Sequence, residues 1–262
     1  MDPSLKTAAT GMAAQQTRID VIANNLANVS TPGFKRSRAH FEDLLYQTIE
    51  GEQVIDSPEA EVSAPVQVGR GTRLAGILRV HEQGPMEITE RPLDIAIDGE
   101  GFFQIRRPDG TIAYTRDGSF TISDQGMLVT SGGYALIPEA TITEDITNLQ
   151  ISRVGIISGT TVDSDTPVEI GRVELARFPN APGMLALGEN MFARTGASGE
   201  PIVGNPQEDG FGRIVQGALE ASNVAVVQEM VDMIAALRAY EINAKAVQAS
   251  EDMADVTNQM VR

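Results

Sequence analysis

The sequence predicts an α+β protein in which two long terminal helices pair as a coiled coil, with all-β outer domains inserted between them. Three observations lead to this prediction. Gly and Pro, which weaken or break helices, are nearly absent from residues 1–31 and wholly absent from residues 222–262. Apolar residues in both segments recur every seven positions, as in a coiled-coil seam. Between them, turn motifs with Gly, Asp and Pro recur about every 8 to 12 residues, which is typical of short strands.

The first helix is expected to begin at Asp2 and to end near Asn28, because Pro32-Gly33 follows as a stop signal. Asp2 can cap the helix. Pro3 is tolerated at the first helical position, where its missing N–H would have no partner. The predicted seam of this helix consists of Leu5, Met12, Ile19, Ile22 and Leu26.

The last helix is expected to begin at Ser222 or Asn223, which are both good cap residues, and to continue to the C-terminus. Residues 1–40 carry five basic and two acidic residues, whereas residues 222–262 carry three basic and six acidic ones. These opposite charges favour packing of the two helices, although an exposed pair contributes only about 0.2–1 kcal/mol. The predicted seam of the last helix consists of Val226, Met230, Met233, Leu237, Tyr240, Ala244 and Val247.

Residues 35–70 are expected to connect the first helix to the β region. The segment begins with basic residues, and a short helix is expected at Phe41–Tyr46. Residues 50–61 then contain five acidic residues and no basic one, and nearby prolines favour an extended chain. This acidic stretch is either a solvated linker or a brace between subunits.

The interior of the chain is expected to form compact β domains. The strongest hairpin signal is the turn Pro108-Asp109-Gly110, which is flanked by Phe102–Ile105 and Thr111–Tyr114. Residues 179–212 are expected to be rich in loops. The expected domains are the terminal helices (1–34 and 222–262), the connecting segment (35–70), a β-rich domain (71–137 and 187–221) and a smaller outer β domain (138–186).

The composition excludes several classes of function. The net charge of −16 argues against nucleic acid and anionic membranes as main partners, because both require a basic surface. The chain has no cysteine, and its two histidines lie far from acidic residues at ligand spacing. No nucleophile motif and no complete phosphate-binding loop occurs. We therefore expect no catalytic, cofactor-binding or metal-binding residues.

The N-terminal region lacks the unbroken apolar core of a signal peptide, and no window approaches the ~18 apolar residues of a membrane span. These features fit a cytosolic protein. They fit equally well a protein that is exported by a route without a cleaved signal.

Four stretches resemble, in order along the chain, the motifs of bacterial flagellar rod and hook proteins. The longest covers residues 22–36, reads IANNLANVSTPGFKR, and resembles the N-terminal signature of that family. The other three are Gly99–Phe103, Tyr114–Phe120, and Ala239–Asn243 with Lys245-Ala246. The signature residues singled out are Asn24, Asn25, Asn28, Pro32, Gly33 and Phe34.

Within this family, the chain is most similar to the distal rod type, because of Phe41–Gln47 and the long connecting segment after it. The resemblance implies a structural subunit of the distal rod, which polymerises into a helical tube and transmits torque from the motor to the hook. The implied partners are further copies of the chain, other rod proteins, the hook protein, the surrounding ring proteins and the flagellar type III export apparatus. The implied location is the basal body, where the rod crosses the periplasm, with export that needs no cleaved signal peptide.

Alternatives stay open. One is a proximal rod or hook subunit of the same family. Another, of a different class, is a peptidoglycan-cutting enzyme that follows the rod through the cell wall, which would need two carboxylates in a cleft. Asn24, Asn25 and Asn28 also have two interpretations: amides that bridge subunits in the inner tube, or exposed polar residues on the back of the seam.

Overall fold

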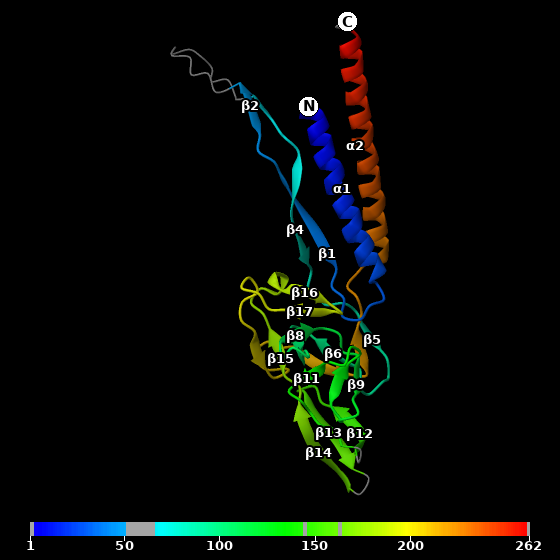
Figure 1. Ribbon diagram of the computed structural model, residues 1–262. Coiled ribbons are helices and arrows are strands. Elements are labelled where there is room, and N and C mark those ends of the chain that lie inside the picture. Colours follow the sequence, from blue (N-terminus) through cyan, green and yellow to red (C-terminus); the bar gives the residue numbers. More distant parts are fainter. Residues whose placement is uncertain (1–2, 51–65, 144–145, 162–163, 261–262) are drawn as a thin grey trace, which may run out of the picture. The chain divides into compact units, whose positions relative to one another are not determined.

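The computed structural model describes the chain except for residues 1–2, 51–65, 144–145, 162–163 and 261–262 (Figure 1). The chain divides into two compact units. Unit 1 comprises residues 1–26, 37–78 and 226–262, and unit 2 comprises residues 27–36 and 79–225. A long helix near each end and short strands between them confirm the mixed α+β class.

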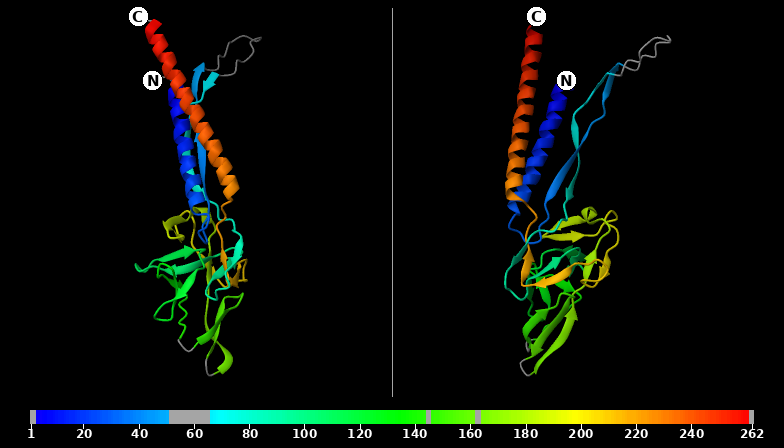
Figure 2. Two further views of the ribbon diagram at one scale, coloured as in Figure 1. Left: turned by 90° about the vertical axis from the view of Figure 1, so that its right-hand side faces the viewer. Right: turned by 180° about the vertical axis from the view of Figure 1, so that it is seen from behind.

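Unit 1 contains the two helices, α1 (Pro3–Ala27) and α2 (Val226–Met260). The helices lie side by side and run in opposite directions, so that the start of α1 and the end of α2 lie at the same end of the unit (Figures 1 and 2). The predicted bounds of α1 are confirmed to within one or two residues, and Pro3 is its first helical residue among those described. The start predicted for α2 at Ser222 or Asn223 is wrong, because residues 221–225 are not helical.

The connecting segment is built from strands. Strand β1 (Ser37–Asp43) pairs with β4 (Thr72–Arg79), and β2 (Gln47–Glu50) pairs with β3 (Val66–Val68). The short helix predicted at Phe41–Tyr46 is therefore wrong. Burial along β1 mostly alternates from residue to residue, as expected for a strand. Pairing with a partner about thirty residues away overrides the local helical preference. The acidic stretch at 50–61 lies, except for Glu50, outside the described residues.

Unit 2 is built around a nine-stranded sheet with the order β16-β17-β8-β7-β11-β10-β9, in which β15 pairs with both β7 and β18. β7 lies in the middle of this order and is therefore paired along both edges, and its residues Phe102–Ile105 are buried. The bounds of these strands are β7 (Phe102–Arg106), β8 (Ile112–Thr115), β9 (Phe120–Ile122), β10 (Leu128–Thr130), β11 (Ala135–Ile137), β15 (Leu175–Arg177), β16 (Leu185–Gly188), β17 (Met191–Ala193) and β18 (Ile202–Gly204).

Smaller sheets extend the unit. The strands β12 (Ile146–Ile151), β13 (Ile156–Thr161) and β14 (Ser164–Arg172) form an antiparallel sheet of their own. Two further pairs are β6 (Ile95–Asp98) with β19 (Arg213–Gln216), and β5 (Met86–Ile88) with β20 (Ala218–Glu220). A 3₁₀ turn spans Ala181–Gly183.

The predicted hairpin at Pro108-Asp109-Gly110 is confirmed, because β7 and β8 pair antiparallel around it, with Arg106 opposite Ile112. Asp109 closes the turn by accepting a hydrogen bond from Thr111 N at 2.9 Å. The expectation that residues 179–212 are rich in loops is confirmed, although β16, β17 and β18 also lie there and join the main sheet. These strands are only three or four residues long, which makes their sequence signal weak.

Two hydrophobic clusters fill unit 2. Phe103 and Ile105 of β7 point into the larger cluster, whereas Phe102, which precedes them, joins a smaller aromatic one. This alternation follows from the two-residue period of a strand. The smaller cluster consists of Phe102, Tyr114, Ala176, Phe178, Met184 and Phe192. A chain with 5% aromatic residues thus forms separate modest cores, as its composition suggests.

Candidate functional site

The face of α2 that meets α1 is made of small and polar residues. Asn25 Nδ2 of α1 donates a hydrogen bond to Glu229 Oε2 at 3.2 Å, and Arg18 pairs with Asp232 at 3.3 Å. Gly11 of α1 faces Asn243, since a Cβ at Gly11 would lie 3.0 Å from the Asn243 side chain. The buried or half-buried residues of this inner row recur every seven positions, namely Glu229, Ala236, Asn243 and Ser250.

The predicted seam residues take different places on the two helices. On α1, Ile22 is buried, and Leu5, Met12, Ile19 and Leu26 are half-buried. On α2, Met233, Ala244 and Val247 are half-buried, whereas Val226, Met230, Leu237 and Tyr240 are exposed. The seven-residue period is therefore shared by the inner row and by the two predicted rows on α2. The inner row contacts α1, and the predicted rows that begin at Val226 and Met230 lie three positions before it and one position after it.

The outer face of α2, defined here as its exposed large apolar residues, has no covering element among the described residues. Their side chains are between 37% and 82% exposed. A helix that is apolar on its outer side normally requires a partner. The members of this outer face are Val226, Val227, Met230, Val231, Ile234, Leu237, Tyr240, Ile242, Met253, Val256 and Met260.

Asn25 fixes the start of strand β1 to helix α1. Its Nδ2 donates to Ser37 O at 2.9 Å, and its Oδ1 accepts from Ser37 N at 2.8 Å, so the amide pairs with backbone as a strand would. Asn25 is only 1% exposed. Both interpretations considered for its amide, bridging subunits and lying exposed on the back of the seam, are therefore wrong. Asn24 is exposed, and Asn28 Oδ1 accepts a bond from Thr31 Oγ1 at 3.3 Å.

The loop after α1, residues 31–36 and called the signature loop here, packs against the turn after β8. Gly33 has φ +69°, and a Cβ there would lie 2.6 Å from Asp117 N. Only glycine adopts this conformation at this separation without strain. Asn190 Nδ2 donates to Pro32 O at 3.0 Å, and the Phe34 ring is buried beneath the Arg79 guanidinium, 5.8 Å away. Two motifs that lie 80 residues apart in the sequence therefore meet here.

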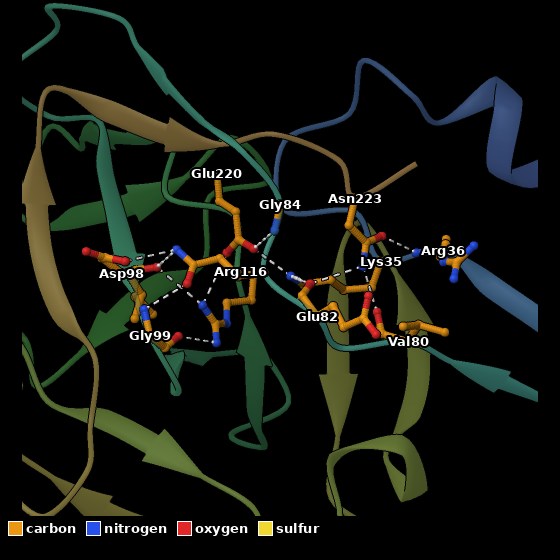
Figure 3. Close-up of polar contacts among 12 residues, drawn as sticks. Lys35, Arg36, Val80, Glu82, Gly84, Asp98, Gly99, Arg116, Glu220 and Asn223 are labelled. Atoms are coloured by element: carbon orange, nitrogen blue, oxygen red, sulfur yellow. Dashed lines mark hydrogen bonds and ion pairs between the residues drawn. The ribbon is translucent and has the colours of Figure 1, made fainter. Parts of the chain in front are cut away.

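A buried charge network holds the signature loop (Figure 3). Lys35 Nζ lies 2.5 Å from Glu220 Oε1, and Arg116 Nη1 donates to Glu220 Oε2 at 3.2 Å. The side chains of Lys35, Arg116 and Glu220 are 1%, 5% and 0% exposed. Gly84 N donates to the same carboxylate at 2.8 Å, and Gly33 N donates to the backbone oxygen of Glu220 at 2.7 Å.

Further donors of this network bind backbone oxygens. Lys35 Nζ donates to Glu82 O at 2.6 Å, and Arg116 Nη2 donates to Gly99 O at 2.8 Å. Desolvation by burial lowers the pKa of Lys35, and the negative charge of Glu220 opposes this effect. Burial likewise lowers the pKa of Arg116. A buried ion pair of this kind is a specific structural contact, and losing one partner typically costs about 3–5 kcal/mol.

Beside the network lies His81, whose ring packs edge-on against Phe102 and Phe192. Burial, followed by the positive charges of Lys35, Arg116 and Arg79, lowers the pKa of His81 to about 4. The imidazole is therefore neutral near pH 7. Groups of three or more His, Asp or Glu that could hold a metal ion do not occur among the described residues. Within the same described part of the chain, no helix combines the length and apolarity needed to cross a membrane.

Comparison with known proteins decides the family. The match to a family model described as flagella basal body rod protein covers residues 5–35. The chain is 48% identical to the flagellar basal-body rod protein FlgG of Borreliella burgdorferi, over 99% of this chain and 98% of that protein. The chain belongs to the flagellar basal-body rod family.

Other matches agree with this assignment. Residues 96–159 match a model of the flagellar hook protein FlgE/F/G D1 domain, and residues 215–260 match a model of the flagellar basal body rod FlgEFG protein C-terminal region. The FlgG proteins of Caulobacter vibrioides and Bacillus subtilis are 44% and 35% identical, over 98% and 95% of this chain and 98% and 96% of their own lengths. The resemblance to the distal rod type is thereby confirmed, and the chain is a structural subunit of the flagellar basal-body rod.

Three of the four rod-family motifs meet in unit 2. The signature loop supplies Lys35, the third motif supplies Arg116, and the second supplies the carbonyl of Gly99 that Arg116 binds. Glu220, which joins the two cations, lies outside all four motifs, and no local pattern singles it out. Only its position on β20, paired with β5, brings it between them.

Asn223 was expected to cap α2, and that expectation is wrong. Its Nδ2 donates to Val80 O at 2.8 Å and to Glu82 O at 3.0 Å, and its Oδ1 accepts from Arg36 N at 2.8 Å. The side chain therefore links the end of the signature loop to the segment that follows β4 (Figure 3). An asparagine that caps a helix and an asparagine that links two loop segments use the same donor and acceptor atoms. The residue type alone therefore does not distinguish the two roles.

Proposed function

We propose that this rod subunit polymerises through its terminal helices into a helical tube, which serves as the rigid distal rod and transmits torque from the motor to the hook. The observation that supports the proposal is the outer face of α2. The inner row of α2 is already used against α1 within the chain, so the exposed apolar residues are available to neighbouring copies. On this proposal, the predicted coiled-coil seam is mainly a contact between subunits.

The outer face of α2 has enough apolar side chains to hold copies of the chain together. Full burial of a Val, Leu, Ile or Met side chain contributes about 1.5–3 kcal/mol, whereas association costs roughly 4–15 kcal/mol in lost freedom of motion. Burial of roughly six outer-face side chains per subunit would therefore offset that cost. Contacts through different surfaces of each copy do not close, and they generate an open helical polymer.

The proposal extends to partners and location. We infer that the chain contacts other rod proteins, the hook protein and the surrounding rings, and that it is exported through the flagellar type III apparatus without a cleaved signal, to a rod that crosses the periplasm. We also infer a structural and not an enzymatic role. For the connecting segment, the brace interpretation is favoured by Leu45 and Tyr46, which are 88% and 56% exposed beside the β2–β3 pair.

The alternative within the family is a proximal rod subunit. The chain is 32% identical to the flagellar basal-body rod protein FlgF of Caulobacter vibrioides, but 44% identical to the FlgG of the same organism. This difference favours the distal rod. No specific observation favours a peptidoglycan-cutting activity.

The test uses purified full-length protein and the double variant Met230→Glu, Ile234→Glu, which places two charges on the outer face. We expect wild type to form tubes or filaments, as measured by sedimentation and electron microscopy, and the variant to stay soluble with unchanged helix content by circular dichroism. The matched control is Gln248→Glu, an exposed polar position on the same helix. Normal polymerisation of the double variant would show that the outer face is not the assembly surface.

A further inference from the structure

Most of the eleven arginines of unit 2 are matched to a carboxylate within the unit. Ion pairs join seven of them to Asp or Glu in the described chain, for example Arg106 to Glu139 at 2.5 Å and Arg213 to Asp98 at 2.6 Å. Arg79 instead lies against aromatic rings. Charged side chains of unit 2 without an ion-pair partner in the unit are therefore candidates for a contact with another copy of the chain.

Arg153 and Arg172 form a basic pair of this kind. Arg153 is exposed in the turn between β12 and β13, and Arg172 Nε donates to Val154 O in the same turn at 3.5 Å. The turn is held in place, because Gly155 N donates to Ser152 O at 2.9 Å and Ile214 N donates to Arg153 O at 3.1 Å. Neither arginine has an ion pair with any described carboxylate.

A pocket with the opposite charge lies elsewhere on unit 2. It has a volume of about 270 Å³, and its lining includes Asp117, Tyr134 and Glu189. The Tyr134 hydroxyl donates a hydrogen bond to Glu189, and this bond together with the negative charge raises the pKa of Tyr134. Asp117 Oδ1 accepts two bonds from Ser119, at 3.0 and 2.7 Å. Neither carboxylate has an ion pair within the described chain.

The size of the pocket favours a single side chain. Its volume lies just below the roughly 300–1,000 Å³ range of pockets for drug-sized ligands. Gly132 forms part of the wall, and a Cβ there would lie 2.8 Å from the Tyr134 ring. A planar guanidinium can bind a carboxylate with two parallel hydrogen bonds and can stack on an aromatic ring, so arginine fits this lining better than lysine.

We propose that the pocket lined by Asp117, Tyr134 and Glu189 receives Arg153 from the β12–β13 turn of a second copy of this chain. The charges of the two surfaces are complementary, and no ion pair joins them within one copy. Because the two surfaces differ, the contact is head-to-tail and propagates from copy to copy. This inference rests on the proposed polymerisation and adds a second contact, made by unit 2, to the one made by α2.

The test is a charge exchange in the full-length protein. We expect Arg153→Glu and Glu189→Arg each to raise the critical concentration for polymerisation about tenfold or more, by sedimentation, because each places like charges together. The double variant restores opposite charges between copies and returns the critical concentration to within a few-fold of wild type. The control is Glu87→Arg, an exposed acid on β5, which we expect to have little effect.

A second variant blocks the pocket without changing charge. Gly132→Val fills the space beside Tyr134, and we expect it to raise the critical concentration while the unfolding transition shows that unit 2 remains folded. Single charge variants that polymerise like wild type, while the outer-face variant of α2 does not, would overturn the pocket contact and leave the proposed polymerisation intact. The pairing of Arg153 with Glu189 would also be overturned if each single variant raised the critical concentration and the double variant did not lower it again.

Discussion

Removing the negative charge of Glu220 is the most direct perturbation of the buried charge network. The substitution Glu220→Gln keeps the shape of the side chain but leaves Lys35 and Arg116 without their counter-ion. The carboxylate accepts bonds from Lys35 at 2.5 Å, Arg116 at 3.2 Å and Gly84 N at 2.8 Å, whereas an amide offers one acceptor oxygen and a donor group.

The expected magnitude follows from burial. Breaking one partner of a buried ion pair costs about 3–5 kcal/mol, so we expect the free energy of unfolding to fall by about 4 kcal/mol. Single domains have total stabilities of roughly 5–15 kcal/mol, so unit 2 would lose a large part of its stability. For a domain of this size, each kcal/mol corresponds to roughly 2–4 °C in Tm, which gives a decrease of about 8–16 °C.

The assay is urea and thermal unfolding of the full chain in the non-polymerising Met230→Glu, Ile234→Glu background, followed by tyrosine fluorescence. The hydrogen-exchange rates of the backbone amides of residues 27–36 and β20 measure the local stability of the network. The control is Glu87→Gln, since Glu87 is exposed on β5. A loss below about 1 kcal/mol would refute the reasoning, because it would mean that Glu220 is not the counter-ion of two buried cations.

The pH dependence of Glu220→Gln provides an independent check. Burial lowers the pKa of Lys35, and without Glu220 nothing in the network opposes this as strongly. The unfolded chain then binds a proton at Lys35 that the folded chain lacks, so the stability of the variant rises with pH up to the unfolded pKa of Lys35 near 10.5. We expect wild type to show a weaker rise over the same range.

Two further predictions concern neighbouring residues. His81 has a folded pKa of about 4 and an unfolded pKa of 6.5, so the unfolded chain binds more protons between these values, and stability falls by up to about 3 kcal/mol as the pH decreases from 6.5 to 4. His81→Phe should remove this slope in urea unfolding at pH 4 to 7, and an unchanged slope would assign it to another group. Gly33→Ala should lower the free energy of unfolding by about 2 kcal/mol or more, because it combines a left-handed φ of +69° with a Cβ 2.6 Å from Asp117 N. Its control, Gly76→Ala, meets no atom within 4 Å and should change stability by less than about 1 kcal/mol.

The helices and the first hairpin could be predicted because their signals are local. Absence of Gly and Pro, seven-residue periodicity and a Pro-Asp-Gly turn depend only on near neighbours in the chain. The strand at Phe41 and the role of Asn223 could not be predicted in this way. In both cases, the residues that determine the local structure by pairing or hydrogen bonding lie about thirty or more positions away in the sequence. The local preference of the segment is too weak to override these contacts.

The orientation of α2 illustrates the same division. The heptad period is a property of the sequence, but three rows on α2 share that period, and the two more apolar rows form the predicted seam. Within one chain, the contacts of Asn25 and Gly11 place the row of Glu229 and Asn243 against α1. The small residues of that row, facing a glycine, are a signal that sequence reasoning could have used.

The sequence by itself determined the α+β class, the two terminal helices and the family, because these depend on composition, period and contiguous motifs. The tertiary structure decided which motif residues work together. Lys35 and Arg116 meet at Glu220 only because the pairing of β20 with β5 places that carboxylate between them. A buried charge requires an opposite charge or hydrogen-bond partners from anywhere in the chain, and separation along the sequence carries no information about which residue supplies them.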